Sequence, residues 1–298
     1  MVLMQFGRKS GSVADPSWHL RAVLLPDGRL AQHTWLSADG WRDEPIPGAD
    51  ELPGRFALPG FIDAHSHVSF GRGSDGPVPV DGPRAEANLE RYARDGVAVV
   101  RDAGGAPNVV LALPTVAGRP HVVAAGRHLA PAGMYFAAVH DPVEPPDVVD
   151  IALNELAAGA RWVKLVGDFP PASARALSAS ALPEPAYDLE VVRNLVNATH
   201  KADARIAVHT TTTLVADLVR LGVDSVEHGT ALDPGTIGHM AARGTAWTPT
   251  LCAVLSCPED APEERRQRVA ERRERLSELL PLAVRLGVPI LTGSDVVG

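Results

Sequence analysis

Residues 58–67, Leu58-Pro59-Gly60-Phe61-Ile62-Asp63-Ala64-His65-Ser66-His67, join an apolar run to a pair of histidines. Residues two apart in a β-strand point to the same side, so both imidazoles can reach one ion. The apolar run predicts a strand over Ala57–Ile62, with the histidines where that strand ends. In α/β barrels this end of the strands carries the active site. The stretch therefore predicts the first strand of a barrel and one wall of a metal site.

From this stretch onward the chain alternates apolar runs with segments of helical spacing. Eight runs predict strands: Ala57–Ile62, Val97–Arg101, His121–Ala125, Trp162–Val166, Arg205–Val208, Ser225–Glu227, Ala246–Pro249 and Pro289–Leu291. The predicted helices are Arg84–Arg94, Asp147–Ala158, Leu189–Ala202, Leu214–Leu221, Pro234–Arg243 and Glu259–Leu286, with a shorter link at Pro107–Leu113. Strands separated by helices imply parallel crossovers. We therefore predict an α/β fold, a (β/α)8 TIM-type barrel, over residues 58–298.

Residues 1–57 have a different pattern. The apolar runs Leu20–Leu25 and Leu30–Leu36 are separated by Pro26-Asp27-Gly28, and Ala38-Asp39-Gly40 follows. Turn residues between short apolar runs are typical of antiparallel strands. We therefore predict that residues 1–57 form a small β-sandwich portion before the barrel.

Composition excludes several classes of function. The net charge of −8 argues against nucleic acid as the main partner, because phosphate binding needs a basic surface. The arginines of Glu263–Glu278 are interleaved with acids at helical spacing, which is typical of a solvated helix. The two cysteines, Cys252 and Cys257, do not form a disulfide framework or a four-cysteine zinc site.

No segment of the sequence has the pattern of a targeting or membrane segment. Residues 1–10 lack the apolar core of a signal peptide, and no run approaches 18 continuous apolar residues. We expect a cytoplasmic protein that acts on a small-molecule substrate and binds neither nucleic acid nor membrane. The sequence is also compatible with a homo-oligomer.

Three further candidate ligands follow later apolar runs. His209 closes Ile206–Val208, His228 closes Ser225–Glu227, and Asp295 follows the eighth predicted strand. One histidine after a strand is more often structural. Four histidines and an aspartate at the ends of barrel strands are better explained as ligands of a divalent ion such as Zn²⁺.

Lys164 lies inside the apolar run Trp162-Val163-Lys164-Leu165-Val166. Burial and nearby metal ions both favour its neutral amine. A neutral amine can add carbon dioxide to give a carbamate, whose two oxygens can bridge two ions. The alternatives are an ion pair with Asp102 or Asp168, or a side chain that extends to the barrel rim.

Together these segments resemble the amidohydrolase superfamily of metal hydrolases. The resemblance extends over nearly the whole chain. Within the superfamily, the segments Glu227-His228-Gly229-Thr230 and Thr248-Pro249-Thr250-Leu251 look like the imidazolonepropionase-related and Xaa-dipeptidase (prolidase-like) branch. The matching segments are residues 59–67, Trp162-Val163-Lys164, Val208-His209, Val226-Glu227-His228-Gly229-Thr230, Thr248-Pro249-Thr250 and Gly293-Ser294-Asp295.

Carried over to these positions, the resemblance implies two ion sites. One would be held by His65, His67 and Asp295, the other by His209 and His228, with carboxylated Lys164 as the bridge. It also implies that Asp295 handles the proton. We take His228 as a second catalytic residue, because we expect it to help polarise the carbonyl. Tyr135 and His140, on the loop after the third strand, are candidate substrate contacts.

Two features depart from the resemblance. Many relatives carry Gly-Gly-His where this chain reads Ala132-Gly133-Met134-Tyr135, which weighs against a dipeptide-like substrate. Relatives also continue past the eighth-strand aspartate with a helix and further strands, whereas this sequence ends at Gly298. We therefore expect a barrel truncated after its eighth strand, without its final helix. The Pro-rich segment Pro170–Pro185 is expected to form a long loop near the substrate.

The leading functional hypothesis is metal-dependent hydrolysis of an amide or other C–N bond in an N-acyl amino acid, dipeptide or cyclic amide. One or two divalent ions, with Zn²⁺ the first choice, would lower the pKa of water from 15.7 to about 7. Asp295 would accept the proton and return it to the leaving nitrogen. Two alternatives remain: a mononuclear deaminase or cyclic amidase with unmodified Lys164, and an inactive truncated fragment that acts as a binding module.

Overall fold

The computed structural model describes residues 17–25, 28–37, 40–52, 54–74, 76–177 and 181–297. The chain divides into two compact units, Met1–Phe61 and Ile62–Gly298. The domain boundary after residue 57 stays a prediction. Parts of the sequence-based predictions fall outside the described residues: residues 1–16, Pro26-Asp27, Ala38-Asp39, residues 178–180 and Gly298.

The N-terminal unit contains one five-stranded sheet. Its strands are β1 (Trp18–Leu24), β2 (Arg29–Ser37), β3 (Gly40–Arg42), β4 (Asp50–Leu52) and β5 (Phe56–Ala57). Alternate residues of β1 are buried, and Trp18 and Leu20 pack with Leu36 of β2. The strands β1, β2 and β3 are antiparallel, but β4 and β5 both pair with β1 in parallel. The expectation of antiparallel strands therefore holds for β1–β3 and is wrong for β4 and β5, because the chain crosses to the far side of β1 after β3.

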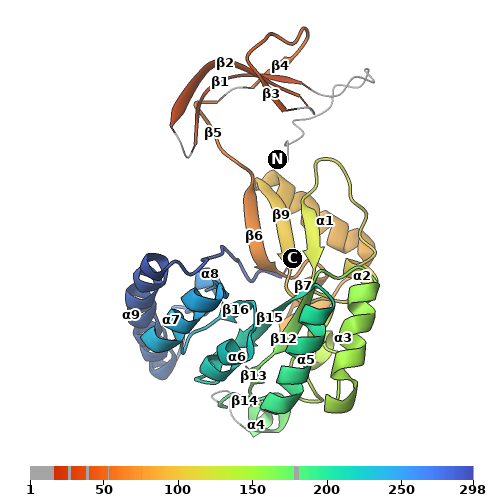
Figure 1. The fold of residues 1–298 in the computed structure, drawn as a ribbon, viewed down its shortest axis with the longest axis vertical. Coiled ribbons are helices and arrows are strands. Elements are labelled where there is room, and N and C mark those ends of the chain that lie inside the picture. The colour runs from red at the N-terminus through yellow and green to blue at the C-terminus, as the bar shows by residue number, and fades with distance from the viewer. Residues whose placement is uncertain are drawn as a thin grey trace. The chain divides into compact units, whose positions relative to one another are not determined.

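The second unit has two sheets of apolar strands (Figure 1). The order in the three-stranded sheet is β10-β9-β6, and that in the five-stranded sheet is β11-β12-β15-β16-β17. All pairs in the five-stranded sheet are parallel. Their bounds are β6 Phe61–Ser66, β9 Val97–Asp102, β10 His121–Ala124, β11 His128–Leu129, β12 Trp162–Val166, β15 Arg205–Thr210, β16 Ser225–His228 and β17 Ala246–Thr248.

Two short antiparallel pairs lie outside these sheets. One joins β7 (Phe70–Gly73) to β8 (Gly76–Pro79), and the other joins β13 (Asp168–Phe169) to β14 (Glu184–Pro185).

Helices follow most strands. They are α1 Gly82–Arg94, α2 Pro107–Val110, α3 Val148–Ala157, α4 Ala172–Leu177, α5 Leu189–Lys201, α6 Val215–Leu221, α7 Pro234–Arg243, α8 Leu251–Val254 and α9 Glu263–Leu286, with 3₁₀ turns at Ala137–Val139 and Pro145–Asp147. The helices α3, α5, α6, α7 and α9 pack side by side. In α5 the buried residues Val192, Leu195, Val196 and Thr199 recur at helical spacing, which gives it one apolar face. None of the described helices is long and apolar enough to cross a membrane.

Residues 289–297 link the edges of the two sheets. Trp247 of β17 donates its backbone N–H to Pro289 and accepts from Leu291. Farther along, Ala64 of β6 donates to Thr292, and Asp295 donates to the carbonyl of His65. The eighth predicted strand is therefore represented by isolated bridges rather than by a regular strand. The α/β class is shown, but the described strands form separate sheets of three and five rather than one closed barrel.

Several boundaries differ from the sequence-based prediction. The first barrel strand is β6, four residues later than Ala57–Ile62, because Phe56–Ala57 pairs instead with β1. Pro170–Pro185 is not a plain loop, since it contains α4 and ends in β14. The strand β11 was not predicted, because it is only two residues long.

Candidate active site

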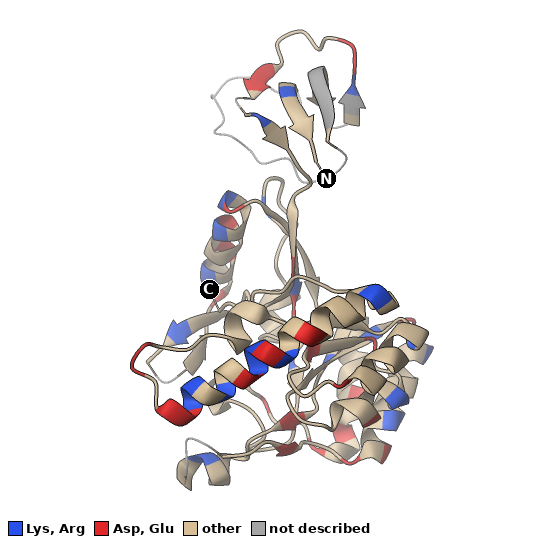
Figure 2. Cartoon of the chain, turned by 90° about the vertical axis from the view of Figure 1, so that its left-hand side faces the viewer, with Lys and Arg blue, Asp and Glu red and all other residues tan. Residues whose placement is uncertain are grey.

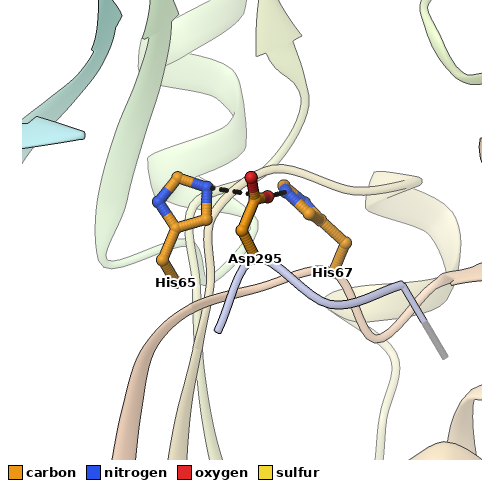
Figure 3. Close-up of side chains that lie close together, drawn as sticks. All are labelled: His65, His67 and Asp295. Atoms are coloured by element: carbon orange, nitrogen blue, oxygen red, sulfur yellow. Dashed lines mark hydrogen bonds and ion pairs between the residues drawn. The ribbon is translucent and has the colours of Figure 1, made fainter. Parts of the chain in front are cut away.

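His65, His67 and Asp295 come together at the end of β6 (Figure 3). Their possible ligand atoms all lie within 4.8 Å of one another. The Asp295 atom Oδ1 is 3.2 Å from Nε2 of His67 and 3.5 Å from Nε2 of His65. Figure 3 shows the carboxylate between the two rings. Two imidazoles and a carboxylate at this separation can hold a divalent ion.

The other nitrogen of each ring is already used. Nδ1 of His65 lies 2.5 Å from Glu227, and Nδ1 of His67 lies 2.7 Å from the carbonyl oxygen of Gly104. An ionised carboxylate and a carbonyl can only accept, so both Nδ1 atoms donate. Both Nε2 atoms lie toward Asp295. In a neutral ring whose Nδ1 donates, Nε2 carries the lone pair, which is the tautomer that metal binding requires.

The loop that carries Asp295 is fixed by Asp63. The carboxylate of Asp63 accepts from the backbone N–H and hydroxyl of Ser294, and from the backbone N–H of His65. Asp295 has a φ of 55° and His228 a φ of 66°, in the left-handed region that non-glycine residues rarely adopt. Such conformations persist only where surrounding contacts hold them, and they concentrate at functional sites.

His209 and His228 form a second pair beside Asp295. Their ring centroids are 4.6 Å apart, and that of His228 is 5.0 Å from that of His65. Nδ1 of His228 lies 3.9 Å from Oδ2 of Asp295 and 2.7 Å from the hydroxyl of Thr250. Asp295 therefore stands between both histidine pairs.

Lys164 is buried in β12 with 1% of its surface exposed. Its Nζ has no hydrogen-bond partner among the described residues. Asp168 accepts instead from the threonines at 210, 211 and 212, and Asp102 accepts from the backbone of Val68. Burial lowers the pKa of Lys164 to about 8, against the attraction of Glu227. The structure thus contains neither of the two ion pairs considered for this lysine.

Lowered pKa values keep His65, His209 and His228 neutral, as metal ligation requires, whereas the hydrogen bond to Asp295 favours a proton on His67. Burial lowers the pKa of both His209 and His228 to about 3, so these rings are neutral at pH 7. Burial, followed by the nearby Lys164, lowers the pKa of His65. Burial opposes the charges of His67 and Asp295, but their hydrogen bond raises the pKa of His67 and lowers that of Asp295.

All six predicted metal ligands line one cavity of about 320 Å³. They are His65, His67, Lys164, His209, His228 and Asp295. Of the two predicted substrate contacts, Tyr135 also lines the cavity. His140 is not among the lining residues, and its Nε2 lies 2.9 Å from the carbonyl of Ala130.

Sequence reasoning missed three buried polar residues around this cavity. Glu227 and Arg101 form an ion pair of 2.6 Å next to His65. His128 stacks on Tyr135 at 4.3 Å, and neither of its ring nitrogens has a partner among the described residues. A charged residue inside an apolar strand is a usable signal for Arg101 and Glu227, the same signal that pointed to Lys164. His128 gives no such signal, because its contacts are with residues from other parts of the chain and depend on the fold.

Comparison with known proteins agrees with this geometry. Residues 56–297 match the amidohydrolase family. An uncharacterised protein of Mycobacterium tuberculosis is 32% identical over 285 residues, which cover 93% of this chain and 74% of that protein. An imidazolonepropionase of Saccharopolyspora erythraea is 27% identical over 262 residues, which cover 82% of this chain and 66% of that protein. The crystal structure of a prolidase with N-methylphosphonate-L-proline matches with a TM-score of 0.71 at 23% identity. The match covers 96% of this chain and 79% of the prolidase chain.

The likeness to the prolidase structure concerns the fold. The family match extends from the end of the N-terminal unit through Asp295, and so includes every position of the candidate site. The resemblance inferred from the motifs is confirmed. The chain therefore belongs to the amidohydrolase family, which places it among the hydrolases that act on carbon–nitrogen bonds.

Proposed function

We propose that this protein is a metal-dependent hydrolase that cleaves an amide or related C–N bond in a small molecule. The observation that carries the proposal is the single cavity lined by all six predicted ligands. Candidate substrates are N-acyl amino acids, dipeptides and cyclic amides. Similarity to a prolidase and to an imidazolonepropionase supports this range of substrates.

The donor set fits one or two divalent ions, with Zn²⁺ the first choice. His65, His67 and Asp295 would hold one ion, and His209 with His228 the other. The buried Nζ of Lys164, which lacks a partner among the described residues, supports a carbamate formed with carbon dioxide as the bridging ligand. When bound, a divalent ion supplies an acidified water and polarises the scissile carbonyl.

The protein's own residues supply the proton transfers. The carboxylate of Asp295 presents Oδ1 to His67 and Oδ2 toward His228. It accepts the proton of the attacking water and delivers it to the leaving nitrogen, acting first as base and then as acid. Neutral His228, adjacent to Asp295, is placed to assist at the carbonyl oxygen.

We also propose that the two sheets belong to one (β/α)8 barrel. The hydrogen bonds of residues 289–297 to β17 on one side and to β6 on the other support this arrangement. Closure at this point would fix Asp295 against the two histidines of the first strand.

A mononuclear deaminase or cyclic amidase is the second candidate. One observation favours it. Among the described residues, His65, His67 and Asp295 are the one group of three or more His, Cys, Asp or Glu side chains whose ligand atoms all lie within 4.8 Å of one another. In that case Lys164 stays unmodified, and His228 serves in catalysis alone.

Metal analysis combined with a substrate screen tests the proposal. Purified protein is analysed for bound metals, then assayed on N-acyl amino acids, dipeptides, lactams and lactones before and after chelation. We expect hydrolysis to disappear on chelation and to return with Zn²⁺, Mn²⁺ or Co²⁺. Full activity of metal-free protein would overturn the proposal. One ion per chain with no response to bicarbonate would favour the mononuclear alternative.

A further inference from the structure

One charged residue of the cavity has no place among the metal ligands. Arg272, on α9, lines the cavity together with Ala253 and Val254. Besides Arg272, the Lys, Arg, Asp and Glu residues lining the cavity are Lys164 and Asp295, both already assigned to the metal site. Figure 2 shows the alternating charges of α9, the long helix at the front of that view.

Arg272 is half-buried, whereas the other arginines of α9 are exposed. Arg266 pairs with Glu263 and Arg268 with Glu264, whereas no acid lies within 4.0 Å of Arg272 in the part of the chain that the structure describes. Its Nη1 donates to the carbonyl of Val254 at 2.7 Å. A guanidinium has five N–H donors, so most of them are left for another acceptor. A half-buried cation without a counter-ion, lining a cavity, is suited to an anion.

A different part of the cavity is aromatic. Tyr135, Phe136 and Phe169 all line it, and the ring centroid of Phe169 lies 5.0 Å from that of Tyr135 and 5.1 Å from that of Phe136. The guanidinium of Arg175 lies 4.8 Å from the centroid of Phe169 and donates to the carbonyl of Tyr135. We call Tyr135, Phe136 and Phe169 the aromatic wall. Such a wall favours a flat apolar group, because stacking adds to the burial of its surface.

The wall also adjoins the catalytic groups. The ring centroid of Phe169 is 5.8 Å from that of His209, one of the proposed metal ligands. A group stacked on the wall therefore stays close to the bond that the metal site would attack.

We propose that the substrate is an N-acylated amino acid with an aromatic group, whose carboxylate binds Arg272 and whose ring packs on the aromatic wall. This inference rests on the proposed function, because it names the substrate class of the same cavity. It assigns recognition of the substrate's carboxylate to Arg272 and selection of its aromatic ring to the aromatic wall.

The test compares acids with neutral carboxamides. The probes are N-benzoylalanine, N-acetylphenylalanine and N-acetylalanine, each as the free acid and as the carboxamide. We expect wild-type protein to prefer the acids, and Arg272→Met to raise the KM of the acids about 10- to 100-fold, the range of a charge-assisted hydrogen bond. The KM of the carboxamides should not change, and Arg272→Lys should retain part of the preference. Arg273→Met, an exposed arginine of the same helix, is the control and should behave as wild type.

Two outcomes would overturn the assignment of Arg272. One is an equal rise in the KM of the acids and of the carboxamides in Arg272→Met, which would mean that Arg272 only supports the Val254 segment. The other is hydrolysis of amides by the wild type with no preference for the acids, which would leave the proposed function intact. If Arg272→Met does not fold, Arg272→Lys provides the test. The ratio of its KM for the acids to its KM for the carboxamides then decides whether Arg272 recognises the carboxylate.

The aromatic wall has its own measurement. Phe136→Leu should raise the KM of the two aromatic acids and leave that of N-acetylalanine unchanged; equal effects on all three would overturn this part. Should no amide be hydrolysed with any metal, the proposed function fails. Calorimetric binding of the acids and carboxamides to wild type and Arg272→Met then still tests recognition by Arg272.

Discussion

Glu227 accepts a hydrogen bond from Nδ1 of His65 at 2.5 Å and so fixes which nitrogen of that ring faces Asp295. Glu227 is fully buried and is held in turn by Arg101 at 2.6 Å and by the hydroxyl of Ser225 at 2.5 Å. Burial disfavours the ionised form of Glu227. The positive charge of Arg101, and to a lesser extent that of Lys164, nevertheless holds the pKa of Glu227 below its ordinary value. An ionised acceptor behind a metal-binding histidine orients the ring and raises its basicity.

Glu227→Gln should therefore weaken metal binding about 10- to 100-fold, the range found when such a partner is removed. The amide keeps the size of the side chain but loses the charge that Arg101 and His65 share. Competition with a chromogenic chelator measures the change in metal affinity.

The matched control is Glu190→Gln, which removes an exposed carboxylate from the first turn of α5. It should leave metal affinity at the wild-type value. Unchanged affinity in folded Glu227→Gln would show that His65 does not depend on this carboxylate for its orientation.

Lys164→Ala should lower the amount of bound metal and the rate of hydrolysis together. The reason is that a carboxylated Lys164 would supply a bridging anion to both ions, and alanine supplies none. Acetate or propionate added to the variant should restore part of the activity, since a small carboxylate can occupy the space left by the side chain. Metal analysis and initial rates with and without the added acid give the answer.

Lys201→Ala, at the exposed end of α5, controls for loss of a lysine elsewhere. Two ions per chain and wild-type rates in Lys164→Ala would contradict a bridging role. A single ion in both wild type and variant would favour the mononuclear alternative.

Strands with continuous apolar runs were predictable from the sequence. The bounds of β12 coincide with the predicted Trp162–Val166, because a strand buried on both faces gives a nearly continuous apolar run, which only Lys164 interrupts here. The first barrel strand was placed too early, since Phe56–Ala57 is as apolar as the start of β6 and only the pairing with β1 separates the two. Local pattern carries no information on which partner a strand finds.

The site was predictable where a residue's chemistry conflicts with its setting. Lys164 within an apolar strand is such a conflict, and the structure buries it without a partner among the described residues. Arg272 gave no such signal, because it lies among many arginines and glutamates of α9 that face solvent. Its place in the cavity depends on how the helix packs, which its own spacing does not determine.

Gly293→Ala should destabilise the protein and weaken metal binding. A Cβ at this position would lie 2.5 Å from the side chain of Thr248 and 2.7 Å from Cβ of His65. Neither neighbour is the free end of a flexible side chain, so β6 or the Asp295 loop must shift. Overpacking of this kind costs about 1–3 kcal/mol, and urea unfolding with a metal titration measures both effects.

Gly238→Ala is the control, because a Cβ there meets nothing within 4 Å and the residue lies inside α7. That variant should be as stable as wild type or more stable. If Gly293→Ala matched it in both stability and metal affinity, the close approach of Gly293 to His65 would be unimportant.

Asp233 should stabilise α7 in a manner that depends on pH. Its carboxylate accepts from the hydroxyl and N–H of Thr236 and from the N–H of Gly235. The hydrogen bonds from Thr236, and then that from Gly235, lower its pKa below 3.8. The stabilisation is therefore fully present above pH 3.8 and is lost as the pH falls through the lower pKa of the folded state. Asp233→Ala should cost about 1 kcal/mol at pH 7.

Urea unfolding of wild type and Asp233→Ala at pH 7 and at pH 3 checks this expectation, and the difference should narrow in acid. Asp188→Ala is a matched control, because Asp188 also precedes a helix but its side chain makes no capping hydrogen bond. It should destabilise the protein less than Asp233→Ala does. Equal losses for the two variants, or a loss at Asp233 that grows as the pH falls, would contradict the capping role, since protonation can only weaken an acceptor of these N–H and O–H groups.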